Sequence, residues 1–162
     1  MASNANLIVD DPKGGIFKVH RSSMTSQDIL ELEWEKVFER SWLYLGHEAE
    51  VPEPGDYRRR TLAGRPLFFN RGRDGQARAF LNTCPHRGAL ICRRDEGNSQ
   101  VFQCFYHAWT FNSQGELMGV PDEAGYGEDF DKKALGLKPP PRVEEYPGGS
   151  TLSASTPTLK TW

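Results

Sequence analysis

Two short segments of the sequence each place one cysteine close to one histidine. The first reads Cys84-Pro85-His86-Arg87-Gly88, and the second reads Cys104-Phe105-Tyr106-His107-Ala108-Trp109, with seventeen residues between His86 and Cys104. Segments so far apart in the chain lie on separate loops, and each loop offers one thiolate and one imidazole. A fold that uses all four side chains must therefore bring the two loops together, which constrains the chain more than any other feature of its sequence.

Two thiolates and two imidazoles on separate loops suit a [2Fe–2S] centre with mixed ligation. In a Rieske centre, two Cys hold one iron and two His hold the other. The neutral imidazoles reduce the negative charge of the cluster and raise its potential to roughly −150 to +300 mV, against about −400 mV for all-Cys plant-type clusters. We therefore predict that Cys84 and Cys104 hold an inner iron and that His86 and His107 hold an outer one.

Zinc is the alternative occupant, because two Cys and two His are also a zinc ligand set. Zinc-finger sequences usually pair Cys with Cys and His with His, whereas the two types alternate along this chain. The remaining thiol, Cys92, follows the apolar residues 89–91, and we predict that it packs in the core. His20 and His47 have no ligand partners nearby in the sequence and are interpreted as ordinary surface or core histidines.

Turn residues and short apolar runs predict a mostly β fold around these loops. Thr25-Ser26-Gln27-Asp28 fits a capping box, and apolar residues at three- and four-residue steps predict one helix from there to about Trp42, with a buried face. Short strands follow at 56–62, 66–70, 77–82, 100–103 and 142–146, and hairpins at 66–82 and 110–120. The predicted fold is one N-terminal helix and a small antiparallel β-sandwich or barrel.

The charge of the chain is small in total but unevenly distributed. A net charge of −2 gives no whole-chain case for nucleic acid, and no apolar run approaches the roughly 18 residues of a transmembrane helix. Residues 58–94 hold ten Arg and one acidic residue, Asp74. These arginines are interpreted either as solvated strand faces and turns or as a basic face that steers an acidic redox partner. Three Cys and no export signal favour the cytoplasm.

The sequence resembles the large (α) subunit of bacterial aromatic-ring-hydroxylating dioxygenases over about residues 8–146. Residues 32–47 are similar to the family's N-terminal helix and the strand after it, and residues 82–88 and 104–109 match its Rieske boxes. Residues 115–121 also fit. Phe105 stands where the family commonly has Pro, and Ala108 stands where it has Gly, but neither change removes a ligand. Respiratory Rieske proteins carry a further Cys in each loop, and its absence here suggests a potential toward the low end of the Rieske range.

The resemblance implies an electron-transfer role. In this family a reductase, often through a ferredoxin, supplies electrons to the Rieske cluster, which passes them to a mononuclear iron held by two His and one carboxylate. That iron activates O₂ in a large C-terminal domain, which we expect this chain to lack because no His follows His107. The α subunits usually form trimers, alone or with β subunits, in which one subunit's cluster serves its neighbour's iron. The aromatic substrate class rests on the resemblance alone.

The expected organisation is an irregular arm (1–24), a helix plus Rieske domain (25–146) and an irregular Ser/Thr-rich tail (147–162). Family members continue past Tyr146 as an apolar strand, whereas this tail cannot bury enough surface to become ordered. We hypothesise that residues 148–162 are read out of frame, against the alternative of a natural short Rieske protein. The alternative functions are a free-standing Rieske-type ferredoxin and a zinc-stabilised structural module. The helical segment 25–42 favours the α subunit, because a minimal ferredoxin does not need it.

Overall fold

The computed structural model describes residues 7–127, 129–145 and 151–155, and its strands pair in antiparallel fashion throughout. The largest sheet has the order β6-β5-β4-β7, and two three-stranded sheets have the orders β10-β9-β8 and β11-β12-β3. The strands of the largest sheet are β4 (Asp56–Leu62), β5 (Arg65–Arg71), β6 (Ala77–Leu81) and β7 (Glu96–Asn98). Those of the other two sheets are β8 (Val101–Gln103), β9 (Thr110–Asn112), β10 (Leu117–Gly119), β3 (Trp42–His47), β11 (Arg142–Glu145) and β12 (Thr151–Ser155). The predicted mostly β, antiparallel fold is confirmed.

Strand β5 separates two hydrophobic clusters. Its side chains alternate between the two faces of the sheet, so Phe68 belongs to one cluster while Leu67 and Phe69 belong to the other. The Phe68 cluster also contains Cys84, Ile91, Cys92, Phe102, Cys104, Trp109 and Phe111. The two cysteines predicted to bind iron are therefore anchored in the main core of the protein.

The helical region ends earlier than the sequence predicts. It consists of α1 (Ser22–Thr25), α2 (Gln27–Lys36) and a 3-10 turn (Phe38–Arg40), and strand β3 already begins at Trp42. Ser26 caps α2 without a side-chain hydrogen bond, so the predicted capping box does not form. No residue of α2 is buried, and Trp42 is 44% exposed. The prediction of a helix to Trp42 with a buried face is wrong, because three- and four-residue spacing does not distinguish one helix from a helix followed by a strand.

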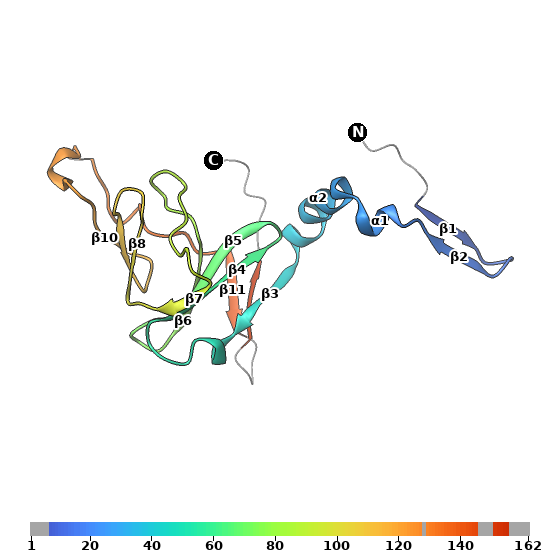
Figure 1. Ribbon diagram of the computed structural model, residues 1–162, viewed down its shortest axis with the longest axis horizontal. Coiled ribbons are helices and arrows are strands. Elements are labelled where there is room, and N and C mark those ends of the chain that lie inside the picture. The colour runs from blue at the N-terminus through green and yellow to red at the C-terminus, as the bar shows by residue number, and fades with distance from the viewer. Residues whose placement is uncertain (1–6, 128, 146–150, 156–162) are drawn as a thin grey trace.

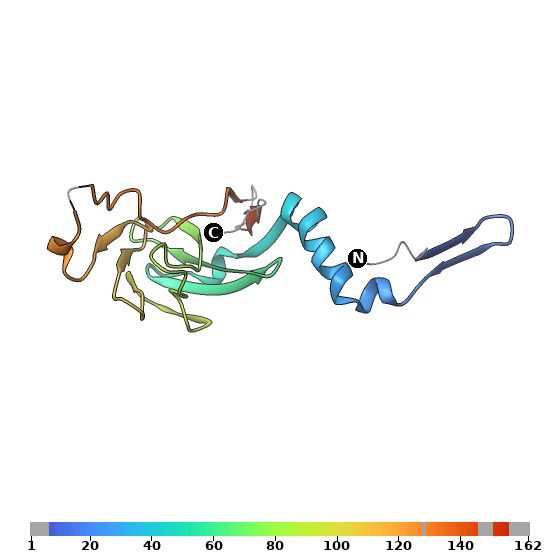
Figure 2. The ribbon, with the colours of Figure 1, turned by 90° about the horizontal axis from the view of Figure 1, so that it is seen from above.

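Two segments predicted to be irregular contain strands. In the arm, β1 (Ile8–Asp11) and β2 (Ile16–Val19) form a hairpin that extends away from the body of the protein (Figures 1 and 2). In the tail, β12 pairs with both β3 and β11. The irregular assignment is wrong for these residues. The arm pairs β-branched and aromatic residues across a turn that contains two glycines, and the mostly small residues of β12 pair through their backbone. The reading-frame hypothesis stays a prediction, and residues 146–150 and 156–162 lie outside the described ones.

Most of the arginines between residues 58 and 94 are neutralised by acidic residues on neighbouring segments. The ion pairs are Arg58–Glu96, Arg59–Asp95, Arg60–Glu50, Arg65–Glu39, Arg71–Glu48 and Arg78–Asp74. Several of these acids lie outside residues 58–94, so counting charges within that stretch alone overstates the positive charge of the folded surface. The strand arginines therefore support the interpretation as half-solvated strand faces. The arginines of residues 58–94 without an ion pair in the described part of the chain are Arg73 on the β5–β6 turn and Arg87, Arg93 and Arg94 in and after the first Cys-His loop.

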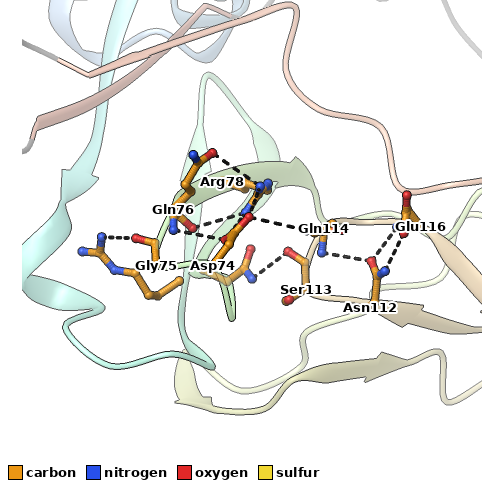
Figure 3. Close-up of polar contacts among 10 residues, drawn as sticks. Asp74, Gly75, Gln76, Arg78, Asn112, Ser113, Gln114 and Glu116 are labelled. Atoms are coloured by element: carbon orange, nitrogen blue, oxygen red, sulfur yellow. Dashed lines mark hydrogen bonds and ion pairs between the residues drawn. The ribbon is translucent and has the colours of Figure 1, made fainter.

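A polar cluster joins the largest sheet to the sheet that carries the second Cys-His loop (Figure 3). The Asn70 side-chain amide on β5 donates to the carbonyl of Ser113 between β9 and β10 at 3.0 Å. Asp74 accepts from Arg78 at 2.6 Å and from Gln114 at 3.5 Å. The hydrogen bonds from Arg78 are the main cause that holds the pKa of Asp74 well below its usual range. These contacts fix the β5–β6 turn against the β9–β10 turn.

Within the described residues, no helix has the length and apolar character needed to cross a lipid bilayer.

Candidate metal centre

The first Cys-His loop follows β6 and is closed by two backbone hydrogen bonds. The Cys84 N–H donates to the Ala89 carbonyl at 2.8 Å, and the Gly88 N–H donates to the Cys84 carbonyl at 2.9 Å. Gly88 has a φ of +72°, a left-handed conformation that residues with a Cβ adopt only at a cost. The turn leaves Cys84 2% exposed and His86 half-buried.

The second Cys-His loop, between β8 and β9, repeats the same turn. The Cys104 N–H donates to the Trp109 carbonyl at 2.8 Å, and the Ala108 N–H donates to the Cys104 carbonyl at 2.9 Å. Ala108 occupies the left-handed position with a φ of +55°. Cys104 is 2% exposed, and His107 is half-buried. Each loop therefore presents one cysteine to the interior and one histidine nearer the surface.

The two loops meet cysteine to cysteine and histidine to histidine. The rings of His86 and His107 have centroids 4.6 Å apart at an interplanar angle of 66°. Burial is the main cause that raises the pKa of the Cys84 thiol to about 11. The nearby Cys104 side chain also contributes to this rise, while the backbone N–H groups of His86 and Arg87 act in the opposite direction. Those N–H groups therefore face the sulfur and would stabilise a thiolate there. The structure thus brings together all four residues that the sequence singles out.

The chemistry of this arrangement fits a two-iron cluster. The Nδ1 atom of His86 is buried, and no described residue forms a hydrogen bond with it, which is costly unless another group satisfies it. Burial is the main cause that lowers the pKa of His86, and the lowered pKa favours the neutral imidazole that binds metals. Within the described residues, no group of three or more His, Cys, Asp or Glu side chains is arranged around one ion. The contacts instead join Cys84 to Cys104 and His86 to His107, a pairing that suits two irons with one pair on each.

Asn82 braces the first loop, and sequence reasoning assigned it no role. Its side chain is fully buried, its Nδ2 donates to the Cys92 carbonyl at 2.8 Å, and its Oδ1 accepts from the N–H groups of Ile91 and Cys92 at 3.1 and 2.8 Å. In the sequence, the signal for this bracing role is a polar residue directly after an apolar strand. The buried amide replaces the strand pairing that this segment lacks, and it fixes the chain that follows the first loop.

The other singled-out residues have structural roles. Cys92 is buried, as predicted, and burial raises the pKa of its thiol to about 12. His20 is exposed, and its Nδ1 lies 2.8 Å from the Ser22 hydroxyl oxygen. The Nδ1 of His47 accepts from the Ala49 N–H at 3.1 Å. Each of these two histidines therefore makes a hydrogen bond to a residue two positions further along the chain.

Comparisons with known proteins agree with this chemistry. The family model described as Rieske [2Fe-2S] domain matches residues 41–147. The α subunit of toluate 1,2-dioxygenase from Pseudomonas putida is 39% identical over 128 residues, which cover 78% of this chain and 28% of that protein. The structure of naphthalene 1,2-dioxygenase from Rhodococcus sp. bound to indole has a TM-score of 0.78 and 31% identity, and the match covers 94% of this chain and 32% of that one.

Similarity extends to an oxygenase named for a different substrate. The structure of a quaternary ammonium Rieske monooxygenase in complex with γ-butyrobetaine has a TM-score of 0.72 and 34% identity, with 88% of this chain and 40% of that chain covered. The chain spans between 28% and 31% of the length of the first curated relatives that it matches. The shared part is therefore the domain that contains the two Cys-His loops.

Replacing Asn82 with Ala is expected to destabilise the protein by about 3 kcal/mol, because it leaves two buried N–H groups and one buried carbonyl without partners. Urea unfolding followed by circular dichroism measures the change. Asn98→Ala is the matched control. The exposed Asn98 side chain donates to the Pro54 carbonyl and to Asp56, where water can replace it, so its loss is expected to cost about 0.5 kcal/mol. Equal losses in the two variants would contradict the bracing role of Asn82.

Replacing Ala108 with Gly is expected to stabilise the protein by about 1 kcal/mol, because Gly adopts the left-handed conformation without steric cost. The opposite change in the other loop, Gly88→Ala, is expected to destabilise by about the same amount. A Cβ at Gly88 would meet no atom within 4 Å, so this cost is purely conformational. Urea unfolding of both variants measures the two stability changes. A less stable Ala108→Gly protein would refute the proposed conformational cost of Ala at this left-handed position.

Proposed function

The chain belongs to the Rieske [2Fe-2S] domain family, and from this premise we propose that it transfers single electrons as the Rieske domain of a ring-hydroxylating dioxygenase α subunit. When bound, a [2Fe–2S] cluster with mixed Cys and His ligands accepts and releases one electron at a higher potential than an all-Cys cluster does. The observation that carries the proposal is the pairing of two buried thiols and two half-buried imidazoles on two turns of the same construction.

We assign the inner iron to Cys84 and Cys104 and the outer iron to His86 and His107. The depth of the two pairs supports this assignment, because both thiols are almost completely buried and both imidazoles are not. The buried and unpartnered Nδ1 of His86 supports it independently. A zinc-stabilised module is disfavoured, because the four side chains form two pairs rather than one tetrahedral group.

The residues of this site perform separate tasks. Burial of Cys84 and Cys104 excludes water from the thiolates, and the N–H groups of His86 and Arg87 offset part of the cost of a charge at Cys84. The imidazole of His107 lies against the ring of Tyr106, at 3.8 Å between centroids, and Tyr106 is 54% exposed. The histidine pair therefore lies close to the protein surface, where a partner can approach it.

His107→Ala is expected to prevent assembly of a normal cluster, because it removes one of the two proposed ligands of the outer iron. Iron and sulfide content and the electron paramagnetic resonance spectrum of the dithionite-reduced protein measure the effect. His20→Ala is the matched control, since His20 is exposed in the N-terminal arm and should leave both measurements unchanged. An unaltered Rieske spectrum in the His107 variant, or a zinc-containing parent protein without iron, would refute the assignment.

We propose that an acidic ferredoxin or reductase supplies the electron at a basic and aromatic surface beside the two loops. Arg87 and Arg93 are exposed, and the Arg93 guanidinium lies 4.7 Å from the ring centroid of Phe105, which is 61% exposed. Unlike the strand arginines, these two form no ion pair within the described part of the chain. Uncompensated positive charge beside a redox centre steers acidic partners during encounter.

Arg93→Glu is expected to slow reduction by an acidic ferredoxin about 10-fold at low ionic strength, with a smaller difference in 0.5 M salt, on the scale of about 10-fold to 1,000-fold electrostatic steering. Stopped-flow absorbance of the oxidised protein mixed with reduced ferredoxin measures the rate. Arg73→Glu makes the same charge change on the β5–β6 turn and serves as the control. Equal slowing in both variants would indicate a general charge effect and would contradict a local docking surface.

The place of this domain in a complete enzyme is also a proposal. We propose that the electron passes on to a mononuclear iron held by a catalytic domain, in a trimer of α subunits with or without β subunits, and that the substrate is aromatic. The names of the relatives, such as an α subunit and a large oxygenase component, support this assignment. A free-standing Rieske ferredoxin is the weaker alternative, because the match to one dioxygenase covers 94% of the chain.

The three free cysteines support the proposed cytoplasmic location.

A further inference from the structure

Trp109 ends the second loop and lies flat against the histidine of the first. Its ring and that of His86 have centroids 4.7 Å apart and an interplanar angle of 2°. Trp109 is only 3% exposed and belongs to the same hydrophobic cluster as Cys84 and Cys104. The two loops are therefore joined through an aromatic stack in addition to the contacts between their paired cysteines and histidines.

A second layer of aromatic residues holds the tryptophan in place. Tyr126 and Phe130 meet the Trp109 ring edge-on, with centroids 6.4 and 6.1 Å away and interplanar angles of 70° and 84°. Tyr126 and Phe130 also pack against each other at 4.3 Å. Edge-to-face contacts of this kind favour one ring orientation over others. The segment after β10 therefore fixes the plane of Trp109, and through it the plane of His86.

The two histidines are held in different ways. His86 faces a buried ring in parallel stacking, while His107 lies at 33° to the ring of Tyr106, which is more than half exposed. The terminal torsion of a histidine side chain has a broad energy profile, so neighbouring groups decide the ring orientation. Outer groups that orient a ligating imidazole also tune the metal that it binds. The stack therefore contacts His86 directly and reaches His107 only through the contact between the two imidazole rings.

We propose that Trp109 is a positioning residue for His86, which fixes the plane of that imidazole and shields one of its faces from water. The proposal rests on the assignment of His86 as a ligand. Tyr126 and Phe130 support His86 through Trp109, whose ring they contact edge-on. The two imidazoles that would hold the outer iron therefore have unlike neighbours, with a buried tryptophan ring beside His86 and a more than half exposed tyrosine ring beside His107.

The test compares Trp109→Leu, which removes the flat stack, with Trp109→Phe, which retains an aromatic face. Pulsed electron paramagnetic resonance of the dithionite-reduced protein resolves the couplings of the two histidine nitrogens. We expect Trp109→Leu to shift one of the two nitrogen couplings and to broaden the distribution of g-values, at unchanged iron content. We expect Trp109→Phe to leave the couplings and the g-values close to those of the parent. Phe17→Leu is the control, because Phe17 is 66% exposed and lies on β2, in the hairpin that extends away from the body of the protein (Figure 1).

A spectrum of Trp109→Leu identical to that of the parent would overturn the positioning role. If Trp109→Leu fails to fold, Phe130→Leu decides, because Phe130 touches Trp109 and its loss should shift the same single coupling to a smaller extent. Unchanged couplings in the Phe130 variant would then overturn the proposal. His86→Ala tests the ligand role of His86 separately from the positioning role of Trp109, because a normal cluster in that variant would refute the ligand assignment itself.

Discussion

The N–H of each predicted cysteine ligand donates to the carbonyl five residues later, and this bond closes both loops of the site. The rest of the arrangement depends on it, because a turn of this size places the cysteine toward the core and the histidine toward the surface. It also requires a left-handed residue before the closing carbonyl, a position filled by Gly88 in one loop and Ala108 in the other. Construction from one turn repeated twice places both cysteines at the same position of the turn, whereas the histidine is the second residue after Cys84 and the third after Cys104.

The turns would have no fixed relation to each other without the core beneath them. Both cysteines belong to the hydrophobic cluster that includes Phe68 of the largest sheet, and Trp109 joins the same cluster. Asn82 fixes the chain after the first loop, while the Asn70–Ser113 contact joins the two sheets that carry the loops. Because the two proposed cysteine ligands lie in the core, we expect cluster binding and folding to be coupled, as is common for metal sites that form only in the folded state.

Sequence reasoning succeeded where a local signal had a single structural meaning. The Asp-Gly turn and the short apolar runs around it predicted strands β4, β5 and β6, and the Asn-Ser-Gln-Gly turn predicted the β9–β10 hairpin. The predicted strand ends agree with the observed ones within about one residue. It failed where one pattern fits two structures, as at Trp42, which continues a helical spacing but begins β3. It also failed for β12, whose small residues form a strand through backbone pairing with β3 and β11. The arginines illustrate a third limit, because Arg58 and Arg59 meet acids that lie just beyond the counted stretch.

The sequence by itself determined the chemistry of the site, because the identity and spacing of Cys84, His86, Cys104 and His107 are local properties of two short segments. The tertiary structure alone decided that the four side chains form two pairs at different depths, and that the two histidines are not equivalent. Those features depend on contacts between residues far apart in the chain, such as the stack of Trp109 on His86. Local sequence sets which atoms can bind a metal, whereas the packing of the core sets where those atoms meet.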